Sequence, residues 1–293
     1  MKKVTYKYRL KGHESFAIRE GWITKGLVAV ESNPFLFSEN YGADELGVGS
    51  NMAKSIRYWL TTANLIEDHS TKGVTLSEVG RVIYEKDMCV GELFTLGLIH
   101  YLLVRNHDKL TTWNVFFNQV DLEDFTKEDL TEVIGNLICE EGKLEEISER
   151  SLSDDVSCLF QMYTRDVPVD YDPEEKKISP FIRLSLLKRE GNKYRKNQPD
   201  REAIDRLLIL VVLLDFFERE EVDSVSIDEL MKAYNGPAHI FHLKRYRLVE
   251  YLDQLAAEQN ITVNHTAGLD MVYKNCDLSS LDVIKSYYTT RSK

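Results

Sequence analysis

The residues best suited to chemistry are gathered in one segment near the N-terminus, GHESFAIREGWITKGL, which runs from Gly12 to Leu27. His13 and Glu14 place a nitrogen base beside a carboxylate, a pair that can act in acid–base catalysis or help to hold a divalent metal. Arg19 could stabilise a developing negative charge. Adjacent side chains point in different directions, so one metal ion would not readily take both ligands. His13, Glu14 and Arg19 are therefore the candidate catalytic residues, but we predict that His13 and Glu14 mainly fix the entry of the first helix.

Motifs that would define an enzyme class are missing from the rest of the sequence. It contains no P-loop, no dinucleotide fingerprint and no HExxH segment. Its four cysteines lack the spacing of a zinc site: Cys89, Cys139, Cys158 and Cys276. The sequence therefore predicts no metal site and indicates free thiols in a reducing compartment.

A second segment, from Ala43 to Ile66, has the pattern of a DNA-reading helix. Apolar residues at helical spacing form one stripe: Met52, Ile56, Trp59, Leu60 and Ala63. The other side chains are hydrogen-bonding, cationic or flat, as contacts to phosphates and base edges require. The predicted DNA-binding residues of this segment are Ser50, Asn51, Lys54, Ser55, Arg57 and Tyr58. We also expect Ser50 to cap the helix. The alternative is a solvated amphipathic helix of a small bundle.

The elements around this helix follow the order of a winged helix. A short helix ending near Leu46 is followed by a turn, the longer helix, a turn-forming cluster after Glu67, and a new helix that Ser77 can cap. This order predicts a winged helix-turn-helix at about residues 41–87, followed by a helical middle region.

A charged and proline-containing break at residues 166–180 predicts the domain boundary. The expected domains are 1–165 and 181–293, joined by that linker. The last third again places helices before a hairpin, so it predicts a second winged-helix-like domain. Its expected DNA-binding residues lie near the start of one helix: Lys244, Arg245 and Arg247. The predicted fold class is mainly α with short β-hairpins, that is, α+β.

Charge is distributed unevenly along the chain. The net charge of −11 argues against a general polyanion binder. Residues 121–155 hold thirteen acidic and three basic residues, whereas the first sixty residues hold nine basic and six acidic ones. Residues 183–206 hold eight basic and four acidic ones. The asymmetry is compatible with one nucleic-acid face and one acidic face, although charge runs are also usual on solvated surfaces.

No apolar run approaches the roughly 18 residues that a membrane span requires. The start of the chain is not followed by the apolar core of a signal peptide. The sequence therefore predicts a cytoplasmic protein without membrane contact.

The two N-terminal segments together resemble a bacterial family long described only as a domain of unknown function. Its members share a Gly-His-Glu-[Ser/Thr]-Phe-x-x-Arg-x-Gly-Trp-x-x-Lys-Gly start and a Leu-Gly-Val-Gly-x-Asn-Met-x-x-Ser-Ile-Arg-Tyr-Trp segment. The matching residues here are Gly12 to Phe16, Arg19, Gly21, Trp22, Lys25 and Gly26, then Leu46 to Gly49, Asn51, Met52 and Ser55 to Trp59. The stretch from Thr266 to Leu269 also fits, and the resemblance is weakest in the middle third.

Members of this family, the SspB-type proteins among them, accompany a cysteine desulfurase, an ATPase and a PAPS-reductase-like enzyme in anti-phage DNA phosphorothioation systems. The resemblance implies a component that binds double-stranded DNA and nicks it. If the protein is a nickase, a divalent metal is the expected cofactor. It also implies the ATPase and the PAPS-reductase-like protein as partners. Two alternatives remain: an adaptor that docks a basic partner through residues 121–155, and a transcriptional regulator of the operon. The sequence leaves open whether the protein is a homodimer.

Overall fold

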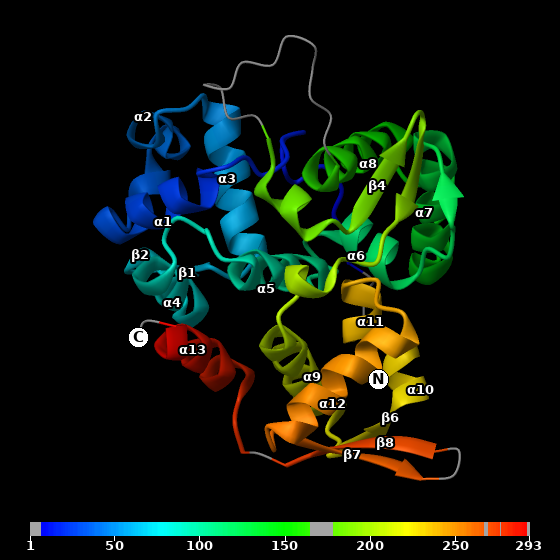
Figure 1. Ribbon diagram of the computed structural model, residues 1–293. Helices are drawn as coiled ribbons and strands as arrows, with labels where there is room; N and C mark the ends of the chain where they lie inside the picture. The colour runs from blue at the N-terminus through cyan, green and yellow to red at the C-terminus, as the bar shows by residue number, and fades with distance from the viewer. Residues whose placement is uncertain (1–6, 165–177, 267–268, 276, 292–293) are drawn as a thin grey trace, which may run out of the picture. The chain divides into compact units, whose positions relative to one another are not determined.

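The computed structural model describes residues 7–164, 178–266, 269–275 and 277–291. The chain is mainly helical with three small antiparallel sheets in this described part, which confirms the expected α+β class (Figure 1). Two compact units are formed, one up to Lys196 and one from Asn197 onward. No helix among the described residues is long and apolar enough to cross a membrane.

The first half of the N-terminal unit contains the two segments singled out in the sequence. Its helices and strands are α1 (Trp22–Ser32), the 3₁₀ turns η1 (Leu36–Ser38) and η2 (Asn40–Gly42), α2 (Ala43–Leu46), α3 (Ser50–Thr62), β1 (Ile66–His69), β2 (Gly73–Leu76) and α4 (Glu78–Lys86). The strands form a hairpin, with Ile66 opposite Leu76 and His69 opposite Gly73. Helix α1 packs against both α3 and β2.

Two capping predictions had different outcomes. Ser77 caps α4 as expected, because its Oγ accepts a hydrogen bond from the Gly80 amide at 2.9 Å. The expectation that Ser50 caps α3 is wrong, because Gly49 occupies the N-cap position and Ser50 is the first helical residue. The Ser50 hydroxyl instead donates to Asn40 Oδ1 at 2.8 Å, which ties α3 to the loop before α2.

The second half of this unit is built on an apolar helix. Its elements are α5 (Leu93–Val104), α6 (Thr111–Asn118), β3 (Asp124–Phe125), α7 (Lys127–Gly142), α8 (Glu149–Tyr163), η4 (Pro180–Leu184), β4 (Leu187–Glu190) and β5 (Lys193–Lys196). Every residue of α5 from Phe94 onward is buried, so this helix forms the centre of the core.

The division between the units lies after Lys196, later than the expected linker at 166–180. Strand β5 pairs with both β3 and β4, so the segment after the linker belongs to the first unit. Its Tyr194 ring stacks on Phe160 of α8, with centroids 3.6 Å apart. Most of the expected linker, residues 166–177, lies outside the described residues.

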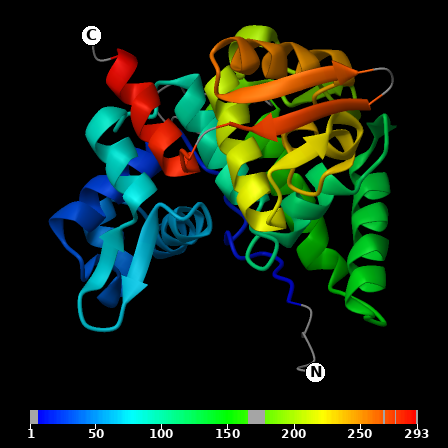
Figure 2. The same ribbon diagram turned by 90° about the horizontal axis from the view of Figure 1, so that it is seen from below.

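The second unit consists of a buried helix covered by shorter helices and a three-stranded sheet. Its elements are η5 (Arg201–Ala203), α9 (Arg206–Glu220), β6 (Ser224–Ser226), α10 (Ile227–Lys232), α11 (Pro237–Ile240), α12 (Arg245–Ala257), β7 (Ile261–Thr266), β8 (Leu269–Lys274) and α13 (Ser280–Arg291). The strand order is β6-β8-β7. Figure 2 shows this hairpin of β7 and β8 alongside the helices of the unit. The family-like stretch at Thr266–Leu269 includes residues 267 and 268, which lie outside the described residues.

Candidate nucleic-acid interface and the buried node beneath it

Helix α3 has an inner face that is wider than the apolar stripe indicated. Trp59 is 2% exposed, as expected for a core residue, whereas Met52 is only half-buried. Ser55 and Tyr58 also lie on the inner face and are buried. The expectation that they contact DNA is therefore not supported by their positions, since neither side chain reaches the surface of the unit.

Both of these polar side chains bind backbone carbonyls from other segments. The Ser55 hydroxyl donates to the Phe16 carbonyl at 3.4 Å. The Tyr58 hydroxyl donates to the Lys109 carbonyl. Burial, reinforced by the nearby Asp155 carboxylate, raises the pKa of Tyr58 well above its usual range. The phenol therefore stays protonated and acts as a structural donor.

The remaining candidates of this segment lie on the outer face of α3, which we define as Ser50, Asn51, Lys54 and Arg57. Asn51 is exposed and the other three are partly exposed. The Lys54 ammonium lies 4.7 Å from the centre of the Tyr41 ring. The Arg57 guanidinium pairs with Asp68 of β1 at 2.8 Å. Asp68 partly compensates the charge of Arg57, whereas Lys54 has no carboxylate partner among the described residues, so Lys54 is the cation of this face best placed to meet a phosphate.

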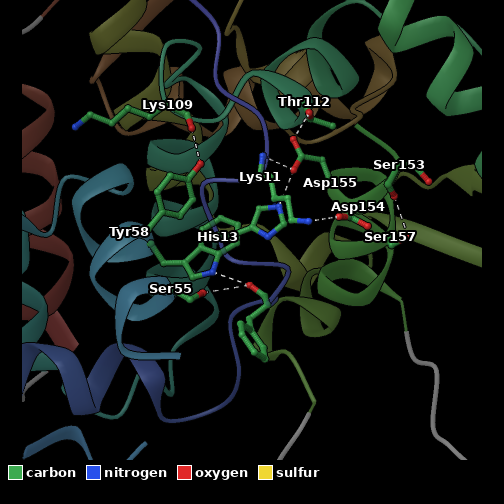
Figure 3. Close-up of polar contacts among 12 residues, drawn as sticks. Lys11, His13, Ser55, Tyr58, Lys109, Thr112, Ser153, Asp154, Asp155 and Ser157 are labelled. Atoms are coloured by element: carbon green, nitrogen blue, oxygen red, sulfur yellow. Dashed lines mark hydrogen bonds and ion pairs between the residues drawn. The ribbon is translucent and has the colours of Figure 1, made fainter. Parts of the chain in front are cut away.

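Beneath α3 lies a buried polar node around the Asp155 carboxylate of α8 (Figure 3). Oδ1 accepts hydrogen bonds from the Lys11 amide at 2.8 Å and from His13 Nε2 at 2.9 Å. Oδ2 accepts from the Thr112 hydroxyl at 2.7 Å. Three donors, two from the N-terminal segment and one from α6, therefore satisfy one buried carboxylate of α8, as burial of a charge requires.

His13 is enclosed by aromatic rings. It is 1% exposed and stacks on Trp59, with centroids 5.6 Å apart and planes at 8°. The Trp113 ring meets it edge-on at 5.6 Å. Its Nδ1 has no hydrogen-bond partner among the described residues. A histidine closed off in this way cannot touch a substrate as the structure stands, which agrees with the structural role predicted for it.

Glu14 turns away from this node. It is exposed, and it forms no side-chain hydrogen bond or ion pair within the described part of the chain. The divergence expected for adjacent side chains is thus confirmed. A stabilising contact of Glu14 is not found, because Asp155 supplies the carboxylate that His13 binds.

The two sequence signatures pack directly against each other. A Cβ on Gly12 would lie 2.3 Å from the Tyr58 ring, and one on Gly26 would lie 2.4 Å from Leu60. The Trp59 indole donates to the Phe16 carbonyl at 2.9 Å. The glycines permit close approach of the N-terminal segment and α1 to α3, so these signature residues build the support of the outer face.

Arg19 reaches a surface groove that the sequence did not reveal. Its guanidinium lies over the rings of Phe16 and Trp22, at 5.5 and 5.3 Å. A groove of about 380 Å³ is lined by Arg19 together with residues from distant segments, among them Cys89 and Arg183. No sequence pattern links these positions, because tertiary contacts bring Arg183 near α1: η4 packs on α5, and the Glu20 amide donates to the Ile178 carbonyl at 3.0 Å.

In the C-terminal unit, the three basic candidates differ in their surroundings. Lys244 is exposed at the N-cap of α12. Arg245 pairs with Asp228 of α10 and, at 3.1 Å, with Asp270 of β8. Arg247 is largely buried and pairs with Glu250 at 3.1 Å. Acidic neighbours compensate both arginines, so Lys244 is the candidate best placed to meet a phosphate.

The same network predicts a pH response at His265 of β7. The hydrogen bonds of its ring to Asp270 at 3.0 Å and Asp253 at 3.3 Å raise the pKa of His265 above its ordinary value. A raised folded-state pKa means that the contribution to stability is complete below the unfolded pKa and is lost as pH rises through the folded one. An NMR titration should show this raised pKa, and Asp270→Asn should lower it. A His265 pKa at or below the ordinary value would contradict the network.

The described residues contain no group of three or more His, Cys, Asp or Glu side chains that could hold a metal ion. The carboxylate at the centre of the node is occupied by its three donors. The described cysteines, Cys89, Cys139 and Cys158, are free thiols.

Comparison with known families identifies the relatives of this chain. A family model described as "Protein of unknown function (DUF4007)" matches residues 10–288. The chain belongs to this family. Comparison with curated proteins gives no match.

Two solved structures are similar to this DUF4007 chain over almost its whole length. A magnesium-ion-bound SspB crystal structure has a TM-score of 0.83 at 25% identity, with 97% of this chain and 89% of that chain covered. A second SspB crystal structure has a TM-score of 0.80 at 24% identity, with coverage of 97% and 87%. The resemblance to SspB-type proteins is thereby confirmed.

Proposed function

We propose that this protein is a DNA-binding component of a phosphorothioation-based anti-phage defence system. Its likeness to SspB structures over 97% of the chain supports the assignment to such a defence system. The family resemblance of both N-terminal signatures supports the same assignment. Double-stranded DNA is the proposed ligand, and the ATPase and PAPS-reductase-like proteins of such systems are the proposed partners.

The observation that carries DNA binding is the outer face of α3. This face presents Asn51, Lys54 and Arg57 from one helix whose opposite side is fixed in the core. The order α2, α3 and the β1–β2 hairpin supports interpretation as a winged helix, with α3 as the helix that enters the major groove. The C-terminal unit is proposed to contain a second winged helix, formed by β6, α10, α12 and the β7–β8 hairpin. Helix α12 corresponds to α3, and Lys244 lies at its start.

Replacing Lys54 and Arg57 together with alanine should weaken DNA binding without unfolding the protein. Each cation lost from a phosphate contact reduces the slope of log affinity against log salt by about one, so the double variant should lose about two. Fluorescence anisotropy with a labelled duplex at several salt concentrations measures this slope.

The matched control for this experiment is Lys143→Ala with Arg150→Ala. It removes the same formal charge from the exposed acidic segment. The control should leave the slope nearly unchanged. An equal loss in both double variants would show that net charge alone controls binding, and an unchanged slope in the Lys54/Arg57 variant would place the DNA interface elsewhere.

A second candidate function, a docking adaptor without catalysis, is favoured by one feature of the acidic segment. A groove of about 530 Å³ between α7 and α8 is lined by five glutamates whose side chains form no ion pair or hydrogen bond in the described part of the chain: Glu128, Glu132, Glu145, Glu146 and Glu149. One lysine, Lys127, also lines this groove. The excess of carboxylates repels DNA and complements a basic protein surface.

A nicking assay on supercoiled plasmid, with and without a divalent metal, separates these functions when run beside a gel shift. Nicking would make the protein the nickase of its system. A shift without nicking favours a DNA-binding component or a regulator of the operon, and the absence of both favours the adaptor. Sedimentation of the same preparations would test whether the protein is a homodimer.

A further inference from the structure

The loop before α2 holds its backbone in an unfavourable conformation. Three consecutive residues have left-handed dihedrals, with φ of 42° at Asn40, 56° at Tyr41 and 73° at Gly42. Glycine and asparagine tolerate this region but an aromatic residue avoids it, so the strain falls on Tyr41 and persists only where the surroundings enforce it. Here Ser50 of α3 donates to Asn40 Oδ1 at 2.8 Å, and a Cβ on Gly42 would lie 2.7 Å from the Leu36 side chain.

The result of this conformation is an aromatic side chain held at the surface. Tyr41 is 44% exposed although its neighbours Leu36 and Phe37 are buried. The Lys54 ammonium lies 4.7 Å from the centre of its ring. The ammonium lies over one face of the ring, which leaves the opposite face for stacking. The pair thus combines a flat surface with a positive charge, as proteins do to bind a nucleobase and its phosphate.

The charges around Tyr41 favour an uncharged nucleobase over a run of phosphates as the ligand of this ring. Glu39, Asp44 and Glu45 are all exposed within four residues of Tyr41. Carboxylates at this density oppose further phosphate contacts in the immediate surroundings of Tyr41, beyond those of the outer face of α3. A nucleobase is uncharged, so stacking of one base on Tyr41 needs only one adjacent phosphate to be neutralised, and Lys54 can do this.

We propose that Tyr41 and Lys54 form a platform for one unpaired base of DNA. This inference rests on the proposed function and specifies the form of DNA that the outer face of α3 favours. Both faces of a base within an intact duplex are covered by its stacked neighbours, so the Tyr41 ring can be used only where a base is unpaired or turned out of the helix. The site should therefore discriminate gapped or distorted DNA from regular duplex.

The experiment compares two probes with the full-length protein: a labelled duplex, and the same duplex with a short central gap that leaves bases unpaired. The wild type should bind the gapped probe more tightly. Tyr41→Ala should lose roughly tenfold in affinity for the gapped probe, as expected for one stacking contact, and little for the intact one. Tyr41→Phe keeps the ring and should retain the preference. Tyr234→Ala, which removes a ring of 41% exposure from the other unit, is the matched control.

The ratio of the two affinities is measured within each preparation, so it does not depend on the folded fraction of a variant. A wild type that binds both probes equally overturns the platform and leaves the proposed DNA binding intact. A preference for the gapped probe that survives in Tyr41→Ala also overturns the platform and leaves the proposed DNA binding intact. If the wild type binds neither probe, the proposed function fails as well.

Discussion

Replacing Asp155 with alanine is expected to destabilise the N-terminal unit by about 3–5 kcal/mol. The substitution leaves three donors in the core without their acceptor: the Lys11 amide, the Thr112 hydroxyl and His13 Nε2. Urea unfolding followed by tryptophan fluorescence measures the change, since Trp59 and Trp113 surround His13.

The adjacent residue provides the control. Asp154 pairs with Lys11 at 2.6 Å, but both side chains are partly exposed. Exposed ion pairs contribute little, so Asp154→Ala should cost less than about 1 kcal/mol. Similar losses of unfolding free energy in the two variants would contradict the prediction, because the buried Asp155 carboxylate would then contribute no more to stability than the surface carboxylate of Asp154.

A substitution of His13, which lies in the same node, tests whether this histidine has a structural or a catalytic role. His13→Ala should lower DNA binding or nicking only in proportion to the unfolded fraction, because His13 is enclosed by Trp59, Trp113 and Tyr58. Loss of nicking in a His13→Ala protein with unchanged unfolding would show instead that the histidine acts in catalysis.

Trp59→Ala should also destabilise the N-terminal unit by about 3–5 kcal/mol. The side chain is 2% exposed, its indole donates to the Phe16 carbonyl, and its ring stacks on His13. The substitution would therefore leave a large cavity between α3 and the N-terminal segment and remove the shorter of the two hydrogen bonds to the Phe16 carbonyl. Thermal and urea unfolding measure the loss.

Phe35→Ala is the aromatic control for this prediction. Its ring is 58% exposed, so its removal should change stability by less than about 0.5 kcal/mol. A melting temperature of Trp59→Ala close to that of the wild type would contradict the orientation of α3, because the outer and inner faces would then be exchanged.

Several local features followed from the sequence because each depends on near neighbours. Helical spacing placed Trp59, Ile56 and Leu60 in the core. The turn cluster after Glu67 predicted the β1–β2 hairpin, and a serine before a new apolar run predicted the cap at Ser77. Periodicity and capping are properties of segments shorter than a few turns, so they can be inferred from one sequence.

The tertiary structure decided which polar residues of the signatures reach solvent. Ser55 and Tyr58 looked suited to DNA, but carbonyls of Phe16 and Lys109 bind them inside the core. The partner of His13 is Asp155, 142 residues away in the chain. Residue types and spacing within a segment carry no information about such distant partners.

The boundary between the units has the same explanation. Composition placed it in the proline-containing break, whereas pairing of β5 with β3 assigns residues up to Lys196 to the first unit. The sequence by itself determined the mainly helical class, the buried stripe of α3, the cap at Ser77 and the family. Long-range hydrogen bonds and packing decided which of the candidate residues support the structure and which remain available to a ligand, because burial depends on segments that meet only in the folded chain.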